Sequence, residues 1–82
     1  MDWKIYKRGH LAKCQHGYYF VCQEFDHEMG SDRWFVKYEA GADKFGEQGH
    51  LTGNIHGFDS LEDAKADSEK DAEEVGRHLG LW

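Results

Sequence analysis

The segment from Phe58 to Val75 reads Phe-Asp-Ser-Leu-Glu-Asp-Ala-Lys-Ala-Asp-Ser-Glu-Lys-Asp-Ala-Glu-Glu-Val, and this segment decides the fold. Apolar and small residues recur along it and just beyond it at steps of three and four, which is the spacing of one face of an α-helix. The stripe consists of Leu61, Ala64, Ser68, Ala72, Val75 and Leu79. Because most of these side chains are small, we expect the helix to lie close against a sheet with an aromatic face.

The start of this helix is specified by two overlapping capping arrangements. One pairs Asp59 with Glu62, and the other pairs Ser60 with Asp63. In each, the first side chain accepts a hydrogen bond from a free backbone N–H of the first turn. Both arrangements predict a helix that begins near Leu61.

The end of the helix is marked by two glycines. Gly76 and Gly80 indicate fraying or a C-terminal cap, because glycine adopts the left-handed conformation that commonly ends a helix. We expect the two residues that follow, Leu81 and Trp82, to fold back onto the body of the protein as a hydrophobic plug.

Upstream of the helix, glycine-containing turns separate runs of aromatic and β-branched residues, which is typical of short strands. The predicted strands are residues 3–7, 11–15, 18–25 and 33–39, with a weaker one at 51–58. Alternation in the fourth strand places Trp34, Val36 and Tyr38 on one face. Residues 40–50 contain three glycines and predict a long loop with Phe45 as its candidate anchor.

These elements predict one α+β domain that spans residues 1–82. Residues 1–58 form an antiparallel sheet of about four strands, a meander, and residues 59–82 form one C-terminal α-helix packed on that sheet, with a short tail. A chain of 82 residues buries only about 60% of its extended surface. The core must therefore rely on large aromatic side chains.

Composition favours a folded protein in the cytoplasm. The chain is 32% charged and 39% hydrophobic, which is typical of a globular domain. No apolar run approaches the roughly 20 residues of a membrane span, and the first residues lack the apolar stretch of a signal peptide. We therefore expect no membrane partner and two reduced cysteines.

Charge is distributed unevenly along the chain. Eight of the sixteen acidic residues but only three of the ten basic ones lie from Asp59 onward, so this part carries −5 of the total charge of −6. Helical geometry places Asp63, Asp67, Asp71 and Glu74 on one flank of the apolar stripe and Glu62, Glu69 and Glu73 on the other. Two acidic rows on a helix about 10–12 Å wide resemble two strands of phosphates. These seven residues are the predicted partner-binding site.

The acidic rows also oppose the helix itself. Asp63 and Asp67, Asp67 and Asp71, and Glu69 and Glu73 are like charges four residues apart, and each pair destabilises a helix by about 0.2–0.5 kcal/mol. A solvated helix face is usually charged, and acidic surfaces aid solubility, so a role in solubility alone is the competing interpretation.

Four potential soft or imidazole ligands fall within thirteen residues, and they raise a metal-binding module as one alternative. They are His10, Cys14, His16 and Cys22. If residues 16–17 form a two-residue turn, Cys14 lies opposite Tyr19 and Leu11 opposite Cys22. The two thiols then point to opposite faces and cannot share a metal, whereas another turn length would reverse this. We predict no metal and no cofactor.

Catalysis and direct nucleic-acid binding are weakly signalled. His27, His50 and His56 lie near acidic or glycine-rich segments, but no nucleophile elbow, phosphate-binding loop or HExxH motif accompanies them. We therefore expect no enzyme. A basic and aromatic cluster lies near the N-terminus, yet the net charge of −6 opposes binding to a polyanion. Alternatively, that cluster pairs with the acidic helix of a second copy in a homodimer.

In size and charge the chain resembles the small acidic inhibitors that phages and mobile elements encode, such as anti-CRISPR and anti-restriction proteins. The glycine-punctuated meander up to Phe58 and the acidic stretch Ser60–Glu74 carry this resemblance. It implies a non-enzymatic DNA mimic in the host cytoplasm, whose carboxylates occlude a positively charged nucleic-acid-binding site on a protein or nucleoprotein complex. The alternative is a small protein-interaction domain that uses its aromatic sheet or the 40–50 loop.

Overall fold

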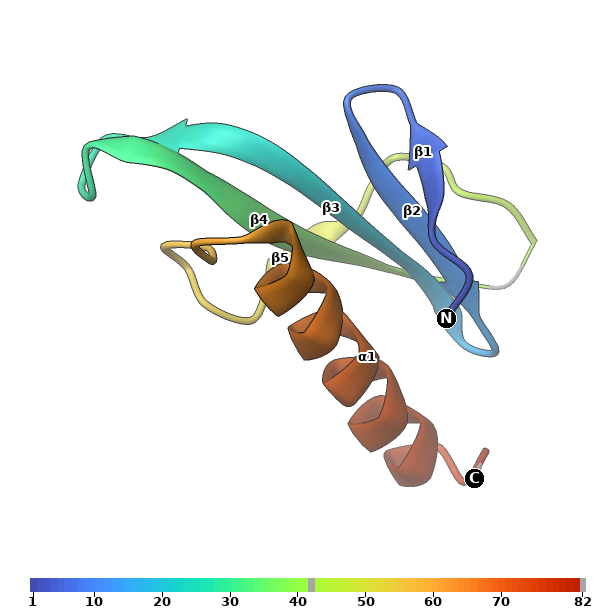
Figure 1. The fold of residues 1–82 in the computed structure, drawn as a ribbon. Coiled ribbons are helices and arrows are strands. Elements are labelled where there is room, and N and C mark those ends of the chain that lie inside the picture. Colours follow the sequence, from blue (N-terminus) through green and yellow to red (C-terminus); the bar gives the residue numbers. More distant parts are fainter. Residues whose placement is uncertain (42, 82) are drawn as a thin grey trace.

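The computed structural model describes residues 1–41 and 43–81 and confirms an α+β fold (Figure 1). Its elements are β1 (Lys4–Tyr6), β2 (Gly9–Cys14), β3 (Gly17–Asp26), β4 (Ser31–Ala40), β5 (His50–Thr52) and α1 (Leu61–His78). The sheet has five strands, one more than the approximate number predicted. Among the described residues, no helix is long and apolar enough to cross a membrane.

The five strands form an antiparallel meander in the order β1-β2-β3-β4-β5. The β3–β4 hairpin is the longest in the sheet, and its tip projects past the N-terminal end of α1 in Figure 1. The prediction of a strand over residues 51–58 is wrong after Thr52, because Gly53 adopts a left-handed backbone (φ +74°) that ends β5. The chain returns to the sheet only at Phe58, which forms an isolated bridge with Trp34.

The β2–β3 hairpin turns one residue earlier than predicted. Cys14 pairs with Gly17, so the turn is Gln15–His16, and the predicted pairings of Cys14 and Leu11 are wrong. Gly17 is the first residue of β3, and the position requires glycine because a Cβ there would approach the backbone oxygen of Glu39 to 2.2 Å. The register moves by two residues, which keeps every side chain on its predicted face. The two thiols therefore lie on opposite faces of the sheet, as expected.

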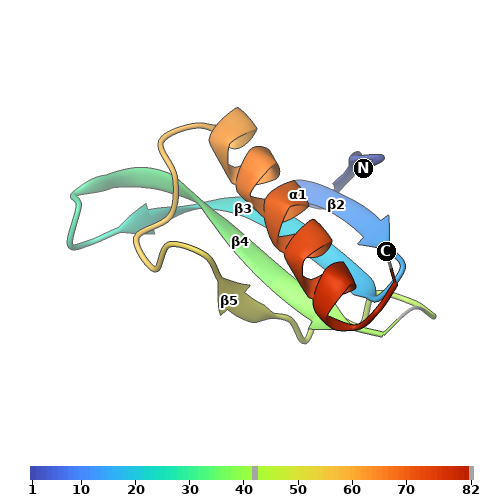
Figure 2. The same cartoon turned by 90° about the horizontal axis from the view of Figure 1, so that it is seen from below.

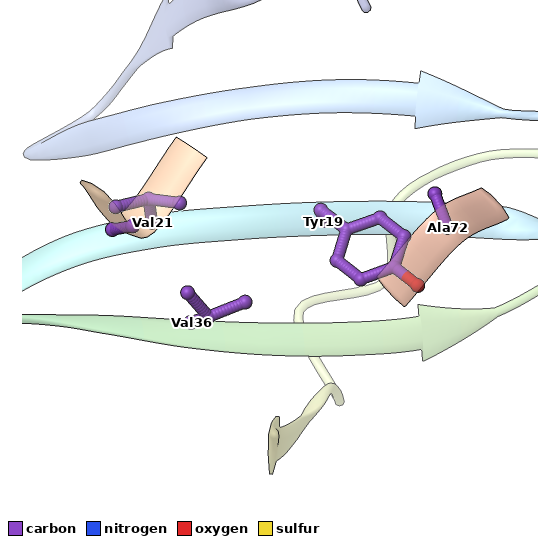
Figure 3. Packing of buried hydrophobic residues seen from close by; sticks show 5 residues of the cluster. Tyr19, Val21, Val36 and Ala72 are labelled. Carbon is purple, nitrogen blue, oxygen red and sulfur yellow. The ribbon is translucent and has the colours of Figure 1, made fainter. Parts of the chain in front are cut away.

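The core lies between one face of the sheet and α1. Figure 2 shows α1 lying across β3 and β4, and Figure 3 shows the buried cluster that they enclose. Tyr19, Val21 and Val36 are fully buried on the sheet side. The predicted aromatic and β-branched face of β4, with Trp34, Val36 and Tyr38, packs toward this cluster.

The helix docks through small residues at steps of four. The buried positions of α1 are Ala64, Ser68, Ala72 and Gly76. The prediction that Leu79 belongs to this stripe is wrong, since its side chain is 56% exposed and Gly76 is buried in its place. A stripe without large side chains lets the helix backbone approach the aromatic face of the sheet closely.

Both ends of α1 are capped. Ser60 is the N-cap, and its side chain accepts from the backbone N–H of Asp63 at 3.1 Å. At the other end Gly80 is left-handed (φ +76°), the N–H of Leu81 donates to the Gly76 carbonyl and that of Gly80 donates to the Arg77 carbonyl, which is a Schellman motif. Leu81 is 43% exposed, so it is not buried as a plug, and Trp82 lies outside the described residues.

Candidate functional site

Because α1 packs on the sheet through small buried residues, the predicted acidic residues lie along its flanks and its outer surface. Five of them are exposed, namely Glu62, Asp63, Glu69, Glu73 and Glu74. Asp67 and Asp71 are half-buried at the junction with the sheet. The predicted row that contains both residues therefore points partly inward, whereas the other row, Glu62, Glu69 and Glu73, faces solvent along its whole length.

Asp71 anchors the helix to the sheet. Its carboxylate accepts a short hydrogen bond from the hydroxyl of the fully buried Tyr19. Burial, followed by the hydrogen bond and charge of Asp71, raises the pKa of Tyr19 far above its usual range. Tyr19 therefore remains a neutral donor, and Asp71 has a structural role besides its place in the acidic row.

Asp67 is held in a negative environment. Burial, followed by the charges of Asp71 and Glu74, raises the pKa of its carboxyl, and Lys70 opposes this shift. The carboxylate also lies against the backbone at Gly53, where an added Cβ would be 2.6 Å from Asp67 Oδ2. Burial is the main cause of the raised pKa, and the negative charges of Asp71 and Glu74 add to it.

Asp67→Asn is expected to stabilise the free protein at neutral pH by up to about 0.5 kcal/mol, the usual scale for substitutions near the surface. Since the pKa of Asp67 is raised on folding from 3.8, the folded state binds protons more readily, and stability falls as pH rises through the window above 3.8. The gain should be present near neutral pH and absent in acid below 3.8. Urea unfolding at both pH values measures it, and an equal effect at both would contradict the assignment.

Several carboxylates near the helix have partners. Glu73 pairs with Arg77 one turn later. Glu69 accepts a hydrogen bond from the Trp3 indole N–H at 3.0 Å and lies 3.7 Å from the N-terminal amine. Asp59, which loses the capping role to Ser60, pairs with Arg33.

The other carboxylates lack such compensation. Lys65 lies over the ring of Trp3, with its Nζ 5.7 Å from the ring centroid. Across residues 1–41 and 43–81, no ion pair within 4.0 Å involves Glu62, Asp63 or Glu74. The exposed acidic surface therefore combines paired and unpaired carboxylates along the whole helix, and its unpaired charge faces solvent.

The four candidate metal ligands do not come together. Cys22 lies on the face of the sheet opposite Cys14, and the His10 ring packs near Trp34 with 6.1 Å between centroids. Only Cys14 and His16 are in contact, with Sγ 3.5 Å from Nε2. The described part of the chain contains no group of three His, Cys, Asp or Glu residues that could hold a metal ion.

His16 instead connects the sheet to the helix. Its Nε2–H donates to the Ala72 carbonyl at 3.0 Å, and its Nδ1 lies 2.9 Å from the Tyr38 hydroxyl. The ring is buried. Because it links the β2–β3 turn, β4 and the middle of α1, its arrangement is that of a structural histidine. The sequence contains no signal that distinguishes it from the exposed histidines.

The remaining histidines are dispersed. His56 lies 3.3 Å from Asp26 and 3.5 Å from Glu28, and it ties the tip of the β3–β4 hairpin to the segment that precedes α1. His27 packs against Phe25 with 5.0 Å between ring centroids, and His50 is exposed at the start of β5. Of these histidines, His56 joins two segments of the chain, whereas His27 contacts a residue two positions earlier.

No protein-family model, curated protein or solved structure matches the chain. Function must therefore be argued from the surface itself.

Proposed function

We propose that the protein is a non-enzymatic inhibitor whose acidic helix occludes a positively charged nucleic-acid-binding site on a partner protein or nucleoprotein complex. The observation that carries this proposal is the mode of docking. Because the residues of α1 that are buried against the sheet are Ala64, Ser68, Ala72 and Gly76, nine residues of the helix remain exposed, and five of these nine are acidic.

Electrostatics supports this kind of partner. A site built from Lys and Arg to hold phosphates presents the complementary charge, and such complementarity increases association rates and excludes wrong partners. The charges of Asp71 and Glu74 add to burial in raising the pKa of Asp67, and a basic partner would reduce this repulsion. The size and acidity shared with anti-CRISPR and anti-restriction proteins suggest the same class of target. We place the protein in the host cytoplasm, without a membrane or nucleic acid as its direct partner.

The test of this proposal is charge reversal at three exposed positions. The triple variant Glu62→Lys, Asp63→Lys and Glu74→Lys is expected to lower partner affinity by at least 100-fold, assuming that each reversed contact contributes about 1 kcal/mol or more. These residues avoid Asp71, whose loss would also remove the bond from Tyr19. The measurement is affinity capture from a bacterial lysate, followed by titration of the retained protein.

A matched control changes the net charge equally at exposed sites away from the helix. Asp2→Lys, Asp32→Lys and Asp43→Lys alter three exposed side chains for which no hydrogen bond or ion pair is found among the described residues. The proposal requires that this control retains the partner. If the two triple variants lose the partner equally, total charge and not the helix governs binding, and the proposal is wrong.

A further inference from the structure

The face of the sheet opposite α1 carries a second candidate surface. Tyr6, Tyr18 and Phe20 form an aromatic cradle there, and Phe45 from the β4–β5 connection lies in it. Its ring centroid is 5.4 Å from that of Tyr6, 5.8 Å from Tyr18 and 5.7 Å from Phe20. The predicted anchor is thus confirmed, and the cradle has the shape of a site for one aromatic side chain.

Phe45 belongs to residues 43–49, here called the strap. The contacts that hold the strap on the sheet come largely from exposed side chains. Lys7 pairs with Glu47 at 2.7 Å, and these side chains are 61% and 50% exposed. Glu39 accepts hydrogen bonds from the backbone N–H groups of Gly46 and Gln48. An exposed ion pair contributes only about 0–1 kcal/mol, so the strap is held weakly at Glu47.

The strap fills only the centre of this face. Three shallow hollows of about 360, 160 and 370 Å³ adjoin the cradle, each lined by Tyr18 or Phe20. Their lining includes five basic residues, namely Lys4, Lys7, Arg8, Lys13 and Lys37. Apart from Glu47 of the strap, it includes only two acids, Asp2 and Glu24. This local excess of positive charge contrasts with a chain whose net charge is −6.

Strand register places these bases beside the cradle. Lys37 lies directly opposite Phe20 on β4, and Lys4 lies opposite Leu11, which itself lies opposite Phe20. A row across the sheet therefore has a lysine on each side of the aromatic centre. An extended segment that crosses the strands would meet Lys4, the apolar Leu11 and Phe20, and then Lys37.

We propose that this face binds an acidic, extended segment of a partner protein that places an aromatic side chain in the position of Phe45 and a carboxylate in that of Glu47. The strap is the internal model for this ligand, because it already supplies a phenyl ring and, two residues later, a carboxylate to Lys7. The site is independent of the acidic helix, which lies on the other face.

The ring geometry favours a peptide over a single-stranded nucleic acid. Bases bind to open aromatic surfaces by parallel stacking. Here the interplanar angles between Phe45 and the cradle are 34°, 49° and 83°. These angles suit a side chain inserted among rings. The negative charge of the whole molecule also opposes a long polyanion.

The test uses the full chain with an emptied cradle, Phe45→Ala with Glu47→Gln, followed by amide NMR. The probe is a synthetic peptide that carries Phe-Gly-Glu between flanking glutamates, and the control peptide has alanine in place of phenylalanine. We expect shifts at Tyr6, Lys7 and Phe20 and an affinity at least tenfold higher than that of the wild-type chain, whose strap competes at about millimolar effective concentration. Lys7→Gln in the emptied variant should weaken binding several-fold.

Glu47→Gln alone is a second variant, which removes only the exposed ion pair with Lys7. Its affinity for the peptide should lie between those of the wild-type chain and the emptied variant. The proposal is overturned if the emptied and folded variant binds neither peptide at millimolar concentration, or binds both equally. It is also overturned if a single-stranded oligothymidine binds this face more tightly than the peptide does. A variant with an emptied cradle that forms a dimer and binds no peptide would overturn it as well.

Discussion

Tyr19→Ala is expected to lower the free energy of unfolding by about 3–5 kcal/mol, the range for removing a large aromatic side chain from a core. Tyr19 is fully buried, its ring packs 4.9 Å from that of Tyr38, and its hydroxyl bonds to Asp71 on the helix. The substitution therefore removes packing contacts and leaves the half-buried carboxylate of Asp71 without its hydrogen bond from Tyr19. Because small domains have only about 5–15 kcal/mol of stability, this loss is a large fraction of the total.

Tyr19→Phe separates the two contributions. It keeps the ring and removes only the hydroxyl, so it should cost about 1.5–3 kcal/mol, the range for a hydrogen bond to a charged group. Urea unfolding monitored by tryptophan fluorescence measures both variants. If alanine costs no more than phenylalanine, the Tyr19 ring does not contribute to the core as described.

Ala64→Leu is expected to destabilise the protein by about 1–3 kcal/mol through overpacking. Ala64 is fully buried where α1 faces Val21 and Val36, and a leucine there would lift the helix from the sheet. Leucine has a slightly different helix propensity from alanine, but that difference is small beside the expected effect.

Ala66→Leu is the matched control, because Ala66 lies on the same helix and is exposed. We expect this change to stay within about 0.5 kcal/mol of the wild type. Thermal unfolding followed by circular dichroism compares the two variants. If the two substitutions lower the stability equally, the small side chains of the buried stripe are not needed for the close approach of α1 to the sheet.

The start of the helix and its buried face could be predicted from the sequence because both depend on local signals. Ser60 caps the first turn, and the spacing of Ala64, Ser68 and Ala72 selects the buried face. The strands of the meander were also predictable from aromatic and β-branched runs between glycines. In each case the residues that decide the structure are near neighbours in the chain.

The features that were missed depend on distant contacts. In the β2–β3 register Cys14 pairs with Gly17, which packs closely against the backbone of Glu39 on β4, and neither the turn residues nor the alternation reveals this contact. The bond from Tyr19 to Asp71 joins positions 52 residues apart. As a result, sequence placed Asp71 with the other acids, whereas the structure gives it a partner in the core.

The exposure of Leu79 has a similar origin. Helical periodicity allows either Val75 and Leu79 or Gly76 to continue the stripe, and the direction in which α1 crosses the sheet selects Gly76. That crossing is set by packing against the sheet. Local periodicity alone therefore cannot identify which residues near the end of the helix remain on the surface.

The central claim is that the acidic helix and a nucleic acid compete for one site on the partner. Fluorescence anisotropy of a labelled DNA duplex bound to the captured partner tests it most directly. We expect the wild-type protein to release the duplex, excess duplex to reverse this inhibition, and the Glu62→Lys, Asp63→Lys and Glu74→Lys variant to release none. A ternary complex, in which the partner holds the duplex and the wild-type protein together at full affinity, would contradict the claim.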